Sequence, residues 1–107
     1  MKKIIYNVTI KIDKAIEEEW LEWIQSKHIP DVMKTQCFES YTLSAVRGDE
    51  DEHGVTFSIQ YLAPDSETLQ RYFDEHASDL QKEHSEKYKG RFGAFRTLLN
   101  VINKTNN

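Results

Sequence analysis

The sequence has a single cysteine, Cys37, in its 107 residues. One cysteine excludes an internal disulfide and a metal cluster built from several cysteines. A glycine-rich phosphate loop, a nucleophile elbow and a paired zinc motif are missing too. Because Cys37 stands just before Phe38 at the expected start of a strand, and nothing nearby in the sequence would activate its thiol, we interpret it as a small buried hydrophobic residue.

Long apolar runs are also missing. No stretch approaches the ~20 apolar residues of a membrane helix. Asn7, Thr9 and Lys11 interrupt the apolar region that a secretory signal would need, so we expect a cytoplasmic protein without a membrane partner. The net charge of −4 leaves no excess of positive charge for a nucleic-acid partner. The acidic loop 49–53 lacks the ligand spacing of a calcium loop, and we expect no metal or cofactor.

The sequence does have enough apolar material for a modest core. Hydrophobic residues make up 38% of the chain and aromatic residues 11%, which excludes wholesale disorder. A chain of this length buries roughly two-thirds of the surface that its unfolded form exposes. We therefore predict a single domain over residues 1–102, followed by a frayed tail over residues 103–107.

Alternation of apolar and polar side chains predicts four strands, over residues 4–12, 38–47, 55–63 and 92–102. The second and third strands flank the charged loop 48–54, which has a glycine at each end. Two alternating runs around such a loop form a hairpin.

The first of two expected helices begins at Asp13, which is a good N-cap residue. Its apolar stripe consists of Ile16, Trp20, Trp23 and Ile24. The two tryptophans are interpreted as core residues, with an aromatic wall of a site as the alternative. Because Pro30 disfavours a helical residue before it, the helix should end near Lys27 or His28, with a short turn through residues 31–33.

The second helix begins with the signal Pro64-Asp65-Ser66-Glu67 and closes with Lys87, Lys89 and Gly90. Its apolar stripe runs through Leu69, Tyr72, Phe73, His76, Ala77 and Leu80. The order of elements is β-α-β-β-α-β. This order predicts an α+β, ferredoxin-like domain with a four-stranded antiparallel sheet and both helices on one face.

The two faces of the predicted sheet differ in character. The face toward the helices should carry Tyr6, Val8, Ile10, Tyr41, Leu43, Phe57, Ile59, Tyr61, Phe95, Leu99 and Val101. The other face should carry Ile5, Asn7, Thr9, Thr42, Ser44, Ser58, Gln60, Arg96, Leu98 and Asn100. Such a polar but nearly uncharged face suits a surface that is covered by a second copy and encloses water or a ligand. An ordinary solvated sheet face is the alternative.

His28 is the candidate catalytic residue, because histidine titrates near neutral pH and a helix end can present it to a pocket. A structural role at the helix C-terminus, with a hydrogen bond to a free carbonyl, is the alternative. Either role predicts a partly buried ring with a hydrogen-bond partner. Arg96 needs a partner among its apolar neighbours, and that partner is either an anionic ligand or a carboxylate. Further candidates for binding are Asn7, Thr9, Thr42 and Gln60.

Two other histidines, His76 and His84, are weaker candidates for a functional role. His76 lies one to two helical turns from Asp79 and Glu83, but no second cluster completes a metal site. A solvated helix flank is the favoured interpretation of this group. His84 is given no role.

Three stretches carry a resemblance to a known family: residues 4–10 (IIYNVTI), 20–33 (WLEWIQSKHIPDVM) and 92–101 (FGAFRTLLNV). They resemble the domain-of-unknown-function 4286 family over about residues 3–102. That family looks like a member of the dimeric α/β-barrel superfamily, whose relatives include cofactor-independent monooxygenases, EthD-like proteins and haem-degrading enzymes. The resemblance implies the ferredoxin-like fold and a homodimer in which two sheets pack face to face.

Three functions remain open at this point. The leading hypothesis is a barrel dimer that binds or transforms a small organic molecule, with anions among the candidates, in a polar pocket between the two sheets. The second is a non-catalytic dimeric module in which the same sheet face only packs against its partner. The third is a haem-binding relative that uses His28 or His76 as axial ligand.

Overall fold

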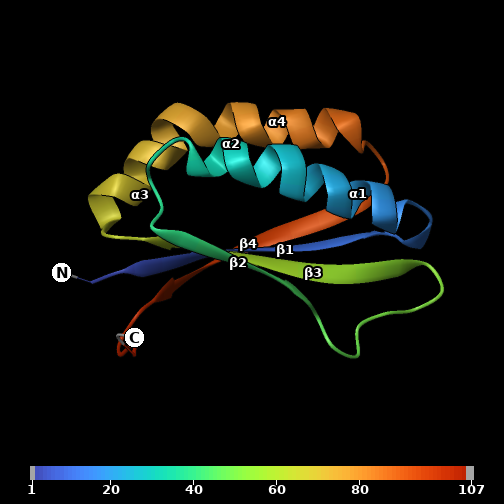
Figure 1. Cartoon of the computed structure of the whole chain (residues 1–107), viewed down its shortest axis with the longest axis horizontal. Coiled ribbons are helices and arrows are strands. Elements are labelled where there is room, and N and C mark those ends of the chain that lie inside the picture. Colours follow the sequence, from blue (N-terminus) through green and yellow to red (C-terminus); the bar gives the residue numbers. More distant parts are fainter. Residues whose placement is uncertain (1, 106–107) are drawn as a thin grey trace.

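The computed structural model describes residues 2–105 as one sheet covered on one face by helices (Figure 1). The ends of the predicted domain and tail, residue 1 and residues 106–107, lie outside the described residues. Along the chain the elements are β1 (Ile4–Asp13), η1 (Lys14–Ile16), α1 (Glu17–Trp23), η2 (Ile24–His28), α2 (Ile29–Met33), β2 (Ser40–Ala45), β3 (Gly54–Ala63), α3 (Ser66–Tyr72), η3 (Phe73–Ala77), α4 (Ser78–Lys87) and β4 (Phe92–Asn100).

The sheet has the strand order β2-β3-β1-β4, and every neighbouring pair is antiparallel. The predicted α+β, ferredoxin-like arrangement is confirmed. The helices form two continuous segments, η1 to α2 and α3 to α4. Both segments lie on the same side of the sheet (Figure 1). No helix in the described part of the chain is both long enough and apolar enough to cross a membrane.

The first helical segment does not end near Lys27, so that prediction is wrong. It continues through α2 to Met33, because η2 is a π-helical turn in which the N–H of Ile29 bonds to the carbonyl of Ile24. The wider turn places Pro30 in the first turn of α2, where a missing N–H costs little. Asp13 makes no side-chain cap and pairs with Arg91 instead.

The start and end of the second helical segment follow the predicted signals. The Asp65 carboxylate accepts a hydrogen bond of 2.8 Å from the backbone N–H of Thr68. At the other end Gly90 adopts a positive φ of 76°, a conformation that favours glycine.

The predicted faces of β4 are reversed. In the observed register Arg96 pairs with Val8 and Phe95 pairs with Thr9, so Arg96 lies on the side of the helices and Phe95 on the opposite side. Leu98 and Leu99 are exchanged in the same way. A shift of one residue moves every side chain to the other face. Because β4 has apolar residues at both parities, its own pattern could not fix the register, which the pairing with β1 sets.

The core fills the space between the sheet and the helices. Trp20 is fully buried, as predicted, and its ring stacks on that of Phe57 at a centroid distance of 5.1 Å. Cys37 is also fully buried, as the sequence indicates. The tyrosines of β1 and β3, Tyr6 and Tyr61, lie side by side under the second helical segment and are 3% and 2% exposed.

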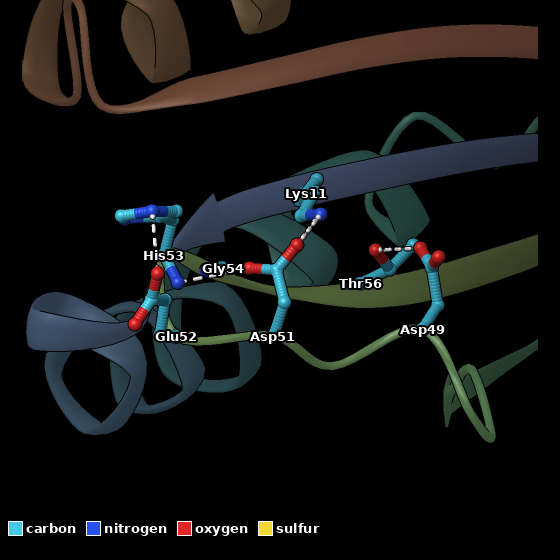
Figure 2. A network of polar contacts seen from close by, with 7 residues as sticks. All are labelled: Lys11, Asp49, Asp51, Glu52, His53, Gly54 and Thr56. Atoms are coloured by element: carbon cyan, nitrogen blue, oxygen red, sulfur yellow. Dashed lines mark hydrogen bonds and ion pairs between the residues drawn. The ribbon is translucent and has the colours of Figure 1, made fainter.

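The acidic loop before β3 is tied to the sheet by its own side chains (Figure 2). One Asp51 oxygen accepts hydrogen bonds from the N–H groups of His53 and Gly54, at 2.8 and 2.9 Å. The other accepts from the Lys11 ammonium at 2.9 Å. This hydrogen bond, followed by the two backbone bonds, lowers the pKa of the Asp51 carboxyl to about 2. The loop charges therefore stabilise a turn.

Candidate functional site

A small cavity lies between the helices and the sheet, and we call it the helix–sheet cavity. Its enclosed part measures about 30 Å³, and the empty space counted out to its open rim is about 440 Å³. An enclosed part of this size takes roughly two water-sized groups. Its lining includes Tyr6, Val8, Tyr61, His28, Val32, Leu80, His84 and Arg96.

Arg96 reaches this cavity because the register of β4 turns it toward the helices. Its Nε donates a hydrogen bond of 3.2 Å to the hydroxyl of Tyr6. Among the described residues no carboxylate forms an ion pair with the guanidinium. The remaining N–H donors of Arg96 are therefore free to bind an acceptor from outside the chain. The planar guanidinium presents these donors in an arrangement that matches the oxygens of a carboxylate.

His28 enters the same cavity from the opposite layer. It is the last residue of η2, and its ring lies 5.4 Å from that of Trp23. The predicted partial burial is confirmed, but the predicted hydrogen bond is wrong for Nδ1, which is buried without a partner among the described residues. Burial lowers the pKa of His28 below its ordinary value, against the opposing charges of Glu83 and Asp31. The ring is therefore neutral near pH 7.

His84 is a cavity residue that the sequence analysis missed. It is 6% exposed, and its Nε2 accepts a hydrogen bond of 3.0 Å from the Trp20 indole. Burial, followed by the charges of His28 and Arg96, lowers the pKa of His84 to about 4. The signal that could have found it is its spacing: it lies four residues after Leu80 and so extends the apolar stripe of the second helix.

Tyr61 was predicted to face the helices, which is confirmed, but no role was assigned to its hydroxyl. That hydroxyl is buried and has no hydrogen-bond partner among the described residues. Burial raises the pKa of the phenol far above its ordinary value, so the group keeps its proton and acts as a donor. The alternation of apolar and polar residues predicts that this tyrosine is buried, but it does not predict which groups surround the hydroxyl.

The other candidates lie on the opposite side of the sheet, which we call the open face. Asn7, Thr9, Thr42 and Gln60 all project there, so the structure does not bring them together with His28 and Arg96. Asn7 is engaged already, since Ser58 donates to its carbonyl oxygen at 2.6 Å and its amide donates to Thr9 at 3.1 Å. Thr42 pairs with Gln60 across two strands.

The third hypothesis requires room for a haem beside His28 or His76, and the structure leaves little. The enclosed part of the cavity at His28, about 30 Å³, is far smaller than a porphyrin. The ring of His76 lies against Tyr72 at a centroid distance of 6.3 Å. Within residues 2–105, no group of three or more histidine, cysteine or acidic side chains is placed to hold a metal ion.

Solved structures share this fold at very low sequence identity. A dimeric ferredoxin-like protein from an uncultured marine organism is 9% identical, with a TM-score of 0.78 over 98% of this chain and 100% of that one. SnoaB, a cofactor-independent oxygenase from Streptomyces nogalater, is 10% identical, with a TM-score of 0.68 over 97% of both chains. An EthD-like protein from Ralstonia eutropha is 11% identical, with a TM-score of 0.70 over 98% and 96%.

These likenesses establish the fold and nothing more specific. No curated protein matches the chain significantly. The family comparison is more direct, because its match covers residues 3–102, almost the whole chain. The chain belongs to the family described as domain of unknown function DUF4286.

Proposed function

We propose that this protein binds a small organic anion in the helix–sheet cavity, with Arg96 as the anchor of its negative charge. The observation that carries the proposal is the meeting of Arg96 and His28 at one cavity from opposite layers of the fold. The proposed site lies inside each protomer, rather than between two sheets as the sequence suggested. The reason is the register of β4, which turns Arg96 toward the helices.

The charges around the cavity favour an anion. Arg96 has N–H donors that no described residue engages. His28 and His84 are both held neutral by burial, so they add no competing charge. A carboxylate in this position would complete charge-assisted hydrogen bonds to the guanidinium, which are among the stronger polar interactions in proteins.

A neutral His28 also suits proton transfer, because its pKa lies below its ordinary value and its Nδ1 has no partner in the described chain. A bound anion that accepts or shares a proton there should raise the pKa of His28. An NMR titration of the ring with and without ligand measures that shift. An unchanged pKa would leave His28 as a structural residue and the protein as a binder without catalysis.

We also infer that the protein is a homodimer whose open faces pack together, and that it acts in the cytoplasm. Phe95 and Leu99 are 62% and 41% exposed on the open face. Structural neighbours are described as dimeric ferredoxin-like proteins. In such a dimer Thr42 and Gln60 would face the partner. A dimer that binds no small molecule would support the non-catalytic module instead.

The binding proposal is tested with short carboxylates, propionate above all, in calorimetric titrations. Arg96→Gln removes the charge and keeps much of the side-chain length, so affinity should fall about tenfold or more, the equivalent of one charge-assisted hydrogen bond. Arg47→Gln is the matched control, because it makes the same change at an exposed loop position away from the cavity. Equal affinities for Arg96→Gln and the wild type would refute the proposal.

A further inference from the structure

We propose that Tyr61 determines which anion the helix–sheet cavity accepts, by donating a hydrogen bond to a second oxygen of the ligand. The cavity would then select a short carboxylate that carries an oxo or hydroxyl group next to the carboxylate. This inference rests on the proposed function, since Arg96 binds the carboxylate itself.

The first observation is the burial of a polar atom without a partner. Tyr61 is 2% exposed near the end of β3, packed against the rings of Phe38 and Tyr6 at centroid distances of 5.1 and 6.1 Å. Its hydroxyl has no hydrogen-bond partner among the described residues, and Tyr61 is one of the residues that line the cavity. A buried hydroxyl without a partner costs free energy, which phenylalanine at the same position would avoid. The hydroxyl therefore points to a molecule from outside the chain.

The second observation is the arrangement of the donors. Arg96 belongs to β4 and Tyr61 to β3, with β1 between them and an offset of two residues along the strands, so their backbones stand roughly 12 Å apart. The hydroxyl of Tyr6, between the two, is already engaged by Arg96. Because the terminal N–H groups of Arg96 can hold both oxygens of a carboxylate, the Tyr61 hydroxyl would donate to an oxygen beside it. The enclosed part of the cavity, about 30 Å³, holds only one end of such a molecule, and the remainder would lie in the open rim.

The test compares pyruvate with propionate, which have the same number of carbons and differ in the oxo oxygen. The wild type should bind pyruvate up to about tenfold more tightly, the effect of one hydrogen bond. Tyr61→Phe removes only the hydroxyl, so it should bind propionate like the wild type and lose the preference for pyruvate. Tyr41→Phe is the control: Tyr41 pairs with Tyr61 on the neighbouring strand, but it is 46% exposed and does not line the cavity.

The outcomes separate this inference from the proposed function. If Tyr61→Phe keeps the preference while Arg96→Gln loses binding, the role of Tyr61 is refuted and the anion site stands. If the wild type binds neither probe, both are refuted. The free energy of unfolding, measured without ligand, is an independent check, because Tyr61→Phe should be at least as stable as the wild type. A clear loss of stability would show that the hydroxyl has a partner within the protein, and would overturn the inference.

Discussion

At the scale of single residues, the two buried histidines of the cavity link its electrostatics to the stability of the fold. His84 is enclosed by Trp20, Tyr88 and Phe92, and it faces His28 from η2 and Arg96 from β4. No acidic group is among the causes of its shift, so nothing offsets the loss of solvation. A proton on His84 would be buried between an imidazole and a guanidinium, and this destabilises the protonated form in the folded state.

Stability should therefore depend on pH in a defined window. The pKa of His84 is about 4 in the folded protein and about 6.5 in the unfolded chain. Between these values the unfolded chain binds more protons, so the free energy of unfolding falls as pH drops from about 6.5 to about 4, by at most about 3 kcal/mol. Urea denaturation at a series of pH values measures the slope.

His84→Gln is the control for this dependence. Glutamine does not titrate, and its amide oxygen can still accept the hydrogen bond of the Trp20 indole. The variant should flatten the dependence on pH, although His28, whose pKa is also lowered, keeps a share of it. An equally steep slope in His84→Gln would mean that the titration belongs to other groups.

At the scale of elements, the first helical segment shows how a local rule can be overridden. Pro30 should be nearly neutral for stability, because the π turn of η2 places it in the first turn of α2. Pro30→Ala should change the free energy of unfolding by less than ~1 kcal/mol. Glu22→Pro, at an exposed position inside α1, should cost ~3 kcal/mol or more, because it removes an internal hydrogen bond. Urea denaturation of both variants tests this contrast, and similar losses would contradict it.

The elements themselves could be predicted from the sequence, because three of the four strands alternate strongly and the second helix carries clear signals at both ends. The end of the first helix could not, because a proline indicates a helix end unless a wider turn precedes it, and no single residue encodes that turn. The face of β4 could not be predicted either. Leu98 and Leu99 are equally apolar, so only the pairing with β1 decides which one faces the helices.

These two errors explain why the candidate site was predicted only in part. His28 was predicted to lie near a pocket because a helix end can present a side chain there, and it does line one. Arg96 was assigned to the open face because the parity of β4 was reversed. The partnerless hydroxyl of Tyr61 and the bond between Trp20 and His84 depend on contacts between distant strands and helices. Such contacts leave no periodic pattern in a single sequence.

At the scale of the whole molecule, the corrected register makes the open face more apolar than the sequence indicated. Phe95 and Leu99 replace Arg96 and Leu98 there, so the face exchanges a cation for an aromatic ring. Across the sheet, Leu99 extends the row formed by Ile5 and Leu62. An apolar row beside uncharged polar groups is the composition expected of the centre of a protein interface.

The homodimer through the open face is therefore the last prediction. A specific interface of this kind should bury more than ~1,000 Å² in total, with Phe95 near its centre. Phe95→Lys places a charge there and should yield a monomer in light scattering at micromolar concentration, with little loss of monomer stability because the position is 62% exposed. Leu98→Lys is the matched control, since Leu98 is 53% exposed on the same strand but on the side of the helices. It should leave the dimer intact. A wild-type monomer, or a dimer disrupted only by Leu98→Lys, would show that the open face is not the interface.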